Sequence, residues 1–290
     1  MRKQAATLSE QWSDQYVQIM QRINEVALRG GLQKYDTYCR IWEYPWIWFQ
    51  VESLRGGNLS VLDIGSEKSP LPWFLATQGF KMIVSDNTGK HWQTWQRASH
   101  NLQVKVRKRI LDAQAIDLPT ASIDIFLSVS VIEHIPHKEQ VIAEAARVLR
   151  PGGLLIMTFD ICEPEMGMSF PKWNGRALSM ADFDCLFRNS SWFEPRLADL
   201  PWNVDSIPSY LEWNRTTAPH HNYIAGAAVV NRNALIWSEP QSIALTRIVR
   251  SITCAYYHQL SHTSRIQLHR WLEHPPILDV AHDMWRRLRK

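Results

Sequence analysis

The segment VLDIGSEKSPLPWF, residues 61–74, has the residue types of a nucleotide-binding loop. An apolar run containing Asp63 leads to Gly65, and the polar residues Ser66, Glu67, Lys68 and Ser69 follow. Nucleotide-binding folds place glycines at such a turn so that the backbone can approach the ligand. Only one glycine is left here, so the segment raises the question of whether the loop still holds a nucleotide and, if so, which one.

Two further carboxylates stand at positions suited to a nucleoside. Asp86 lies 21 positions beyond Gly65, close to the spacing at which an acidic side chain accepts both ribose hydroxyls. A carboxylate suits this role because it only accepts hydrogen bonds and the ribose diol offers two donors. Asp112 is placed to accept from the exocyclic amine of an adenine. The plainer interpretation is that both are ordinary carboxylates in loops after strands.

Apolar strands alternate with helices around these residues, which predicts a parallel sheet covered on both faces. The predicted strands are VLDI (61–64), KMIVSD (81–86), VKVRKRILDA (104–113), IDIFLSVS (123–130) and LLIMTFD (154–160). Ligands bind at the carboxyl ends of such strands. This rule selects Asp63–Ser69, Asp86, Asp112–Ala113, Ser128–His134 and Asp160.

The flanking segments differ from this core. Residues 9–28 have the period of an amphipathic helix, and the aromatic segment IWEYPWIWF (41–49) predicts a second one. The segments RLADLPW (196–202) and YIAGAAVVNR (223–232) predict two strands, joined by a loop, that could pair antiparallel. The chain becomes helical again from about residue 238. We therefore expect an N-terminal helical cap (1–54), a core (55–235) and a C-terminal helical extension (236–290).

Composition is ordinary for a globular protein: 290 residues, 45% hydrophobic, 21% charged, net charge +4. No apolar run is long enough to cross a bilayer and no secretory signal is evident, so we expect a cytoplasmic protein. The four cysteines Cys39, Cys162, Cys185 and Cys254 form no CxxC pair and indicate reduced thiols. The basic ending RRLRK is weak evidence for nucleic-acid binding.

Five motifs in order resemble the class I S-adenosylmethionine-dependent methyltransferases, in particular the small-molecule group with "EHI" and "RPGG" signatures. The motifs are VLDIG, VSD, LDAQAIDLP, IDIFLSVSVIEHIP and AARVLRPGGLLIMTF. The resemblance covers roughly residues 55–235. It implies a Rossmann-like α/β fold with a seven-stranded sheet whose last strand is antiparallel. It also implies S-adenosyl-L-methionine as cofactor and a small or medium-sized organic acceptor, methylated at O or N.

Site residues carry over from this resemblance by position. Asp63 and Gly65 would pass under the methionine part of the cofactor, Asp86 with Asn87 would bind the ribose, and Asp112 with Ala113 the adenine. Ser128 and Val129 would line the methionyl group. The loop lacks the glycines that a dinucleotide pyrophosphate needs. Ser66, Lys68, Ser69 and a helix N-terminus could instead accommodate the carboxylate and ammonium of the methionine.

Metal dependence is not expected. Some relatives bind a divalent ion through Glu-x-x-Glu-His, whereas this chain has Ser130 in the first position, before Glu133 and His134. One carboxylate and one histidine seldom make a site without further ligands.

The sequence says less about the general base and the residues that bind the acceptor. His134 is the leading candidate for a general base, or a structural hydrogen-bonding residue, and Asp160, His220 and His221 are the other candidates. Tyr38, Trp42, Tyr44 and Trp46 would roof the pocket, unless they are core residues, and Met166 and Trp173 would form another wall. We expect a closed and largely apolar pocket.

Other function classes stay open at this point. The chain could methylate RNA with help from its basic tail, or be a non-catalytic scaffold that keeps the fold. A NAD-linked oxidoreductase is the third alternative. The C-terminal helices could form a homodimer surface.

Overall fold

The computed structural model describes residues 1–36, 39–163, 177–188, 190–194, 197–217 and 223–233. The chain divides into two compact units, Met1–Trp237 and Ser238–Lys290, and all described residues belong to the first. The predicted C-terminal helices, and the homodimer surface expected on them, lie outside the described residues.

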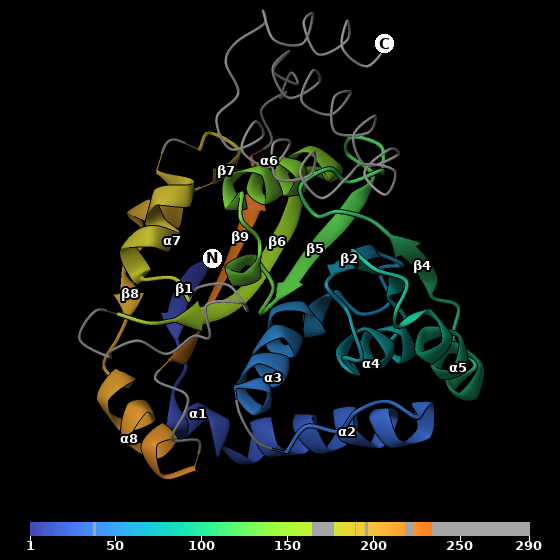
Figure 1. Ribbon diagram of the computed structural model, residues 1–290, viewed down its shortest axis with the longest axis horizontal. Helices are drawn as coiled ribbons and strands as arrows, with labels where there is room; N and C mark the ends of the chain where they lie inside the picture. The colour runs from blue at the N-terminus through green and yellow to red at the C-terminus, as the bar shows by residue number, and fades with distance from the viewer. Residues whose placement is uncertain (37–38, 164–176, 189, 195–196, 218–222, 234–290) are drawn as a thin grey trace, which may run out of the picture. The chain divides into compact units, whose positions relative to one another are not determined.

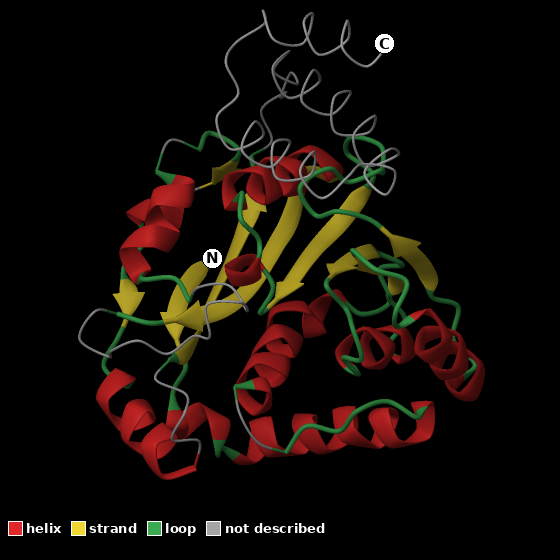
Figure 2. Ribbon diagram, in the orientation of Figure 1, coloured by secondary structure: helices red, strands yellow, loops and turns green. Residues whose placement is uncertain are grey.

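A mixed sheet forms the centre of the first unit (Figures 1 and 2). Its strand order is β4 (Arg107–Ile110), β3 (Lys81–Asp86), β2 (Ser60–Ile64), β5 (Ile123–Val129), β6 (Leu149–Ile161), β9 (Ile224–Arg232), β1 (Arg2–Ala5) and β8 (Trp202–Asn203). The short strand β7 (Phe193–Glu194) pairs with β9. The first five strands are parallel, and β9 is antiparallel to β6. The predicted Rossmann-like α/β fold with an antiparallel last strand is confirmed, but the described sheet has nine strands instead of the predicted seven, in part because β1 and β8 extend it beyond β9.

Helices pack in two groups (Figure 1). One group contains α2 (Asp14–Gly30), which contacts α3 (Arg40–Val51), α4 (Leu71–Thr77) and α5 (Trp92–Leu102). In the other group α6 (Lys138–Val148) packs against β6 and α7 (Met180–Phe187). The short helix α1 (Leu8–Gln11) and the 3-10 turns η1 (Glu52–Leu54) and η2 (Ile132–His134) complete the connections near the site.

Local signals explain where these helices begin and end. Ser13 caps α2, and Gly31 ends it in the left-handed conformation at φ +66°. Ser179 and Asp182 form a capping box at the start of α7. Along the described residues, no helix is both long and apolar enough to span a lipid bilayer.

The N-terminal segment is not only a helical cap, because it begins with a strand that completes the sheet. Residues Arg2–Ala5 form β1 between β9 and β8. Lys3 is buried there, and its ammonium lies 2.5 Å from Asp184 Oδ1 and over the Trp202 ring. Sequence reasoning missed this strand because RKQA is polar. Its lysine can be buried because Asp184, the Trp202 ring and the Ala198 carbonyl surround the ammonium.

The segment at 196–202 corrects a second expectation. Its described part is a 3-10 turn, η5 (Leu197–Asp199), followed by β8, and β8 pairs with β1 instead of β9. The connection to β9 includes the helix α8 (Ile207–Thr217), where we expected only a loop. The position beside β9 is taken by β1, so the predicted antiparallel pair of neighbouring strands does not form.

Candidate active site

Gly65 turns the chain sharply where β2 ends. Its φ is +64°, in the left-handed region that favours glycine. A Cβ added there would lie 2.5 Å from Cγ2 of Val131, which follows β5. The neighbouring strand ends therefore approach so closely that no side chain fits at position 65.

Ser66 and Asp63 form a buried network below this turn. The Ser66 hydroxyl donates to Asp63 Oδ2 at 2.5 Å and accepts from the Ser85 backbone N–H at 3.2 Å. The Ser66 N–H in turn donates to the Ser85 carbonyl at 2.8 Å. Burial raises the pKa of Asp63 to about 7, and the nearby Asp86 charge adds to this, although the Ser66 hydrogen bond opposes it. The Ser66 hydroxyl thus holds β2 and β3 together at the loop.

Asp86 and Asp112 end the next two strand segments. Asp86 Oδ1 accepts from the Thr88 N–H at 3.1 Å, which fixes the carboxylate at the tip of β3. Asp112 Oδ1 accepts from the Gln114 N–H at 2.8 Å. Each is an Asx-type contact that orients the carboxylate by local backbone. Both side chains line the same cavity as Gly65.

This cavity has a volume of about 580 Å³, within the usual range for small-molecule sites. Several predicted residues line it: Asp63, Gly65, Ser66, Ser69, Asp86, Asn87, Asp112, Ala113, Val129, His134 and Tyr44. The structure thus brings together most of the predicted cofactor contacts. Polar side chains predominate among the described lining residues, so the expectation of a largely apolar pocket is wrong for the described part of the wall.

Five predicted residues do not line the cavity. Lys68 is exposed on the far side of the loop, whereas Ser128 is fully buried inside the sheet. Asp160 is buried at the end of β6, where the Asp160 N–H donates to Glu133 Oε1 at 3.2 Å. It is therefore not placed to take a proton from an acceptor in this cavity. The other two are tryptophans of α3.

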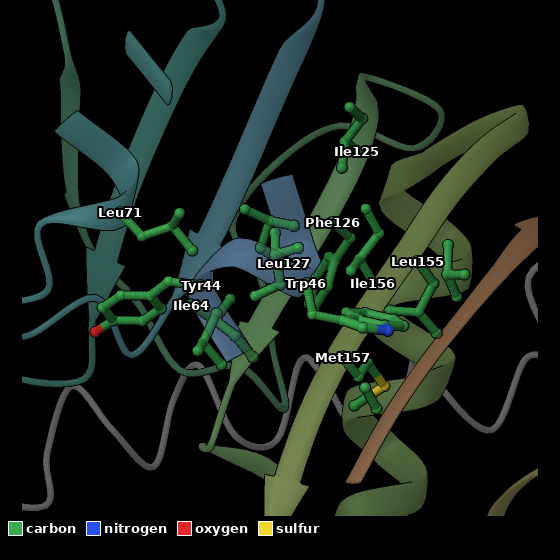
Figure 3. Packing of buried hydrophobic residues seen from close by; sticks show 14 of the residues in the cluster. Tyr44, Trp46, Ile64, Leu71, Ile125, Phe126, Leu127, Leu155, Ile156 and Met157 are labelled. Atoms are coloured by element: carbon green, nitrogen blue, oxygen red, sulfur yellow. The ribbon is translucent and has the colours of Figure 1, made fainter. Parts of the chain in front are cut away.

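Trp42 and Trp46 are core residues with no exposed surface. Their rings stack with centroids 5.8 Å apart, and Trp42 Nε1 donates to Glu10 Oε2 at 3.0 Å. Figure 3 shows Trp46 among Leu155, Ile156 and Met157 of β6, whereas Tyr44 lies beside Leu71. Of the described aromatic residues predicted for the roof, Tyr44 is the one that reaches the cavity.

The remaining predicted residues, Tyr38, Met166, Trp173, His220 and His221, lie outside the described residues. Their roles stay predictions.

Among the polar residues of the described wall, sequence reasoning missed Tyr35, Arg40, Ser85 and Gln114, whereas Ser130 lies in the predicted segment Ser128–His134. The Tyr35 ring packs edge-on against Tyr44 at a centroid distance of 5.6 Å. Arg40 Nη1 donates to Glu43 and, at 2.5 Å, to Ser130 Oγ. Ser130 Oγ donates onward to Glu43 Oε1 at 2.6 Å. One feature of the sequence could have pointed to Arg40. It lies four positions before Tyr44, so the two side chains share one face of α3.

Glu133 and His134 share the turn η2 but face different surroundings. Glu133 is buried, and burial raises its pKa to about 8, with the charge of Glu43 adding to the effect. Burial therefore favours the protonated form of Glu133. His134 is exposed and lies on the cavity wall.

The described residues contain one group with the spacing of metal ligands: Glu67, Asp86 and His91, whose ligand atoms lie within 4.8 Å of one another. Asp86 is also the residue placed to bind a ribose, so the two roles would compete for one carboxylate. The three residues are not those of the Glu-x-x-Glu-His motif, and metal dependence stays untested.

The sheet order, the antiparallel β9 and the cavity at the strand ends are those of the Rossmann-like methyltransferase fold. Residues 62–157 match the family model described as "Methyltransferase domain". This match and the methyltransferase relatives described below support the class I S-adenosylmethionine-dependent methyltransferases as the class of this domain, with S-adenosylmethionine as the cofactor of that class.

Relatives of several kinds are similar to this chain. An uncharacterized methyltransferase of Mycobacteroides abscessus is 30% identical over 180 residues, which cover 59% of this chain and 66% of the relative. The 27-O-demethylrifamycin SV methyltransferase of Amycolatopsis mediterranei is 44% identical over 108 residues, covering 36% and 39%. The chain thus spans less than two thirds of the length of these curated relatives.

One solved structure with a similar fold is geranyl diphosphate C-methyltransferase from Streptomyces coelicolor A3(2), in complex with Mg²⁺, geranyl-S-thiolodiphosphate and S-adenosyl-L-homocysteine. It has 13% sequence identity and a TM-score of 0.53, and the match covers 76% of this chain and 99% of the other. At this identity the likeness concerns the fold alone.

Proposed function

We propose that this protein transfers a methyl group from S-adenosyl-L-methionine to a small or medium-sized organic acceptor, at oxygen or nitrogen. The observation that carries this proposal is the shared cavity of Gly65, Asp86 and Asp112 at three successive strand ends. The relative named for demethylrifamycin, by its name an O-methyltransferase, supports oxygen as the acceptor atom.

The residues present fit the cofactor. Gly65 lines the cavity, and its lack of a Cβ lets the loop pack directly against Val131. Asp86 keeps its carboxylate at the rim of the cavity, where it can accept from a ribose diol. Asp112 and Ala113 line the wall where an adenine would lie.

When bound, the cofactor would supply a methyl group on its sulfonium, and the acceptor would take this methyl group while the thioether of S-adenosylhomocysteine leaves. The contribution of the chain is to bind and orient both reactants, which can supply much of the acceleration. Tyr44 and Tyr35 form the wall from the N-terminal segment, and Ser130 and His134 form the wall after β5. An acceptor between these walls would meet hydroxyl, guanidinium and imidazole groups.

A proton must leave when the acceptor is a hydroxyl group, and His134 is placed to take it. It is exposed to the cavity, whereas Asp160 is buried behind the wall. An imidazole also titrates in the useful range. His134 is therefore proposed as the general base.

The test is a methyl-transfer screen over candidate acceptors, read by mass spectrometry. Asp86→Ala should lose most of its affinity for S-adenosylhomocysteine and most of its activity. Asp117→Ala, at an exposed acid outside the cavity wall, is the matched control and should behave as wild type. Full activity of Asp86→Ala would refute the cofactor assignment.

A further inference from the structure

The side chain of His91 is buried near Asp86 and has no partner among the described residues. His91 is only 6% exposed, and it precedes α5 without capping the helix. No described residue forms a hydrogen bond or an ion pair with its imidazole. Buried polar side chains usually have such a partner, because burying an unsatisfied polar group costs free energy. The imidazole of His91 is therefore a buried ligand group that the fold itself does not use.

Two carboxylates lie close to this imidazole. One oxygen of Glu67, one oxygen of Asp86 and one ring nitrogen of His91 all lie within 4.8 Å of one another. In the described part of the chain, no hydrogen bond or ion pair joins the imidazole to either carboxylate. The three groups are thus too far apart to satisfy one another, and close enough for one cation to bridge them.

Each carboxylate has an oxygen available to a ligand. Asp86 Oδ1 accepts from the N–H and the hydroxyl of Thr88, at 3.1 and 3.3 Å, whereas Asp86 Oδ2 accepts from no described residue. Glu67 is exposed, and its carboxylate accepts no hydrogen bond from the residues that the structure describes. Rotation of the Glu67 side chain can therefore complete a site that the more fixed Asp86 and His91 begin.

Trp95 connects the two segments that carry these ligand groups. Its indole Nε1 donates to the Glu67 carbonyl at 2.6 Å, and its backbone N–H donates to the His91 carbonyl at 3.0 Å. Trp95 itself has no exposed surface. The loop after β2 and the start of α5 are therefore held side by side without any ligand. Groups positioned in advance lose less entropy when a ligand binds.

The donor set selects the class of ion. One imidazole nitrogen and two carboxylate oxygens suit Zn²⁺, whereas Mg²⁺ and Ca²⁺ prefer oxygen ligands alone. Three protein ligands leave the fourth position of a tetrahedral ion to water. Asp63 and Asp112 are further acids of the same cavity wall, and acidic groups lining a cleft raise the local concentration of cations.

The ion site and the cofactor cavity share two residues. Glu67 and Asp86 line the cavity, whereas His91 lies outside its described wall. An ion on Asp86 would occupy the carboxylate that is proposed to accept from the ribose diol. His91 can be replaced without changing a residue of the cavity wall, so the two ligands can be separated by substitution.

We propose that Glu67, Asp86 and His91 bind one Zn²⁺ ion, and that this ion excludes S-adenosylmethionine from the cavity. The ion acts as an inhibitor and not as a cofactor of methyl transfer. Zinc binding requires nothing of the proposed function, whereas the exclusion rests on it. Because the two ligands need the same carboxylate, each lowers the affinity for the other by the same factor.

The first experiment titrates the metal-free full chain, without an affinity tag, with ZnCl₂ by calorimetry. His91→Gln removes the imidazole and keeps a polar side chain. Even partners of metal ligands contribute about 10- to 100-fold to metal affinity, so His91→Gln should weaken zinc at this site by more than about 100-fold. His100→Gln, at an exposed histidine of the same helix α5, is the matched control and should keep the wild-type Kd.

Glu67→Gln gives a second test of the same site. Glu67 is exposed, so its replacement should leave the fold intact even if His91→Gln does not fold. The variant loses a charged ligand and should also weaken zinc. Circular dichroism and the Tm show whether each variant is folded.

The second experiment titrates the same proteins with S-adenosylhomocysteine, with and without zinc. At a zinc concentration about ten times its Kd, the apparent Kd of the wild-type protein for S-adenosylhomocysteine should rise roughly 10-fold. The same zinc concentration should change this Kd by less than about twofold in His91→Gln. With a chelator present, His91→Gln and wild type should bind S-adenosylhomocysteine equally.

The outcomes separate zinc binding from cofactor exclusion. No zinc binding, or equal zinc binding by wild type and His91→Gln, overturns the site. Zinc that binds through His91 but leaves the affinity for S-adenosylhomocysteine unchanged overturns the exclusion. Zinc binding through His91 in a protein that binds no S-adenosylhomocysteine, even with a chelator, confirms the metal site and overturns the proposed function.

Discussion

The hydroxyl of Ser69 donates a hydrogen bond to the hydroxyl of Tyr44 at 3.0 Å. Ser69 belongs to the loop after β2 and Tyr44 to α3, so this bond connects the cofactor loop to the helix that roofs it. Burial raises the pKa of Tyr44, which keeps its hydroxyl protonated at any relevant pH.

Tyr44→Phe should therefore weaken cofactor binding without unfolding the protein. One net hydrogen bond contributes about 0.5–1.5 kcal/mol, which corresponds to roughly 2- to 10-fold in Kd. Calorimetric titration with S-adenosylhomocysteine measures this change. Tyr16→Phe is the matched control, because Tyr16 packs on Phe49 and lies outside the described cavity wall. An unchanged Kd for Tyr44→Phe would show that the loop needs no such connection.

Trp46→Ala should act on stability and not on the cavity. Removing a large buried aromatic side chain costs about 3–5 kcal/mol, and Trp46 is completely buried. The Tm should fall strongly, while the Kd of the cofactor for the folded protein stays near wild type. Trp46→Phe, a milder change, keeps the test valid if the alanine variant does not fold. A loss of acceptor turnover in a stable Trp46→Phe variant would restore the roof interpretation.

Asp63 should make cofactor binding depend on pH. Its pKa is about 7, so it is largely protonated at pH 6 and largely ionised at pH 8. An ionised carboxylate favours a cationic ligand, and S-adenosylmethionine carries a sulfonium that S-adenosylhomocysteine lacks. The Kd of the first ligand should fall more than that of the second between pH 6 and 8. In Asp63→Asn this difference between the ligands should disappear, and its persistence would assign the effect to another group.

Glu133 should reduce stability as the pH rises. The unfolded chain ionises this group near pH 4.5, whereas the folded protein resists ionisation until about pH 8. The stability contributed by the protonated form is thus present below pH 4.5 and is lost progressively up to about pH 8. Glu133→Gln should match wild type in Tm near pH 4.5 and exceed it increasingly towards pH 8. The exposed Glu139→Gln is the control, and a parallel pH profile for Glu133→Gln and wild type would contradict the assignment.

The central sheet and the cofactor wall could be predicted because their signals are local. The apolar strands β2 and β3 carry Asp63 and Asp86 at their ends, Asp112 follows the basic strand β4, and parallel strands bring their carboxyl ends to one edge. Position along the chain was enough to group these residues. No knowledge of packing was required.

The roof could not be predicted in the same way. Tyr44 and Trp46 are two positions apart on α3, and residues at that spacing point to different sides of a helix. Every side of this helix is apolar or aromatic, so the sequence does not show which side meets the cavity. Arg40 was missed because its partner Ser130 lies 90 residues further along the chain.

The strand β1 has a consequence for how the protein forms. Ala5 pairs with Gly226, a partner more than 200 residues away, and β1 lies between β9 and β8. Residues Arg2–Ala5 are synthesised well before β9, so β1 must wait for the last described strand of the sheet before it can pair. Contacts this distant in sequence slow folding. Helix α3 gains its full support only at that late step, so the capacity to bind ligand should appear together with completion of the sheet.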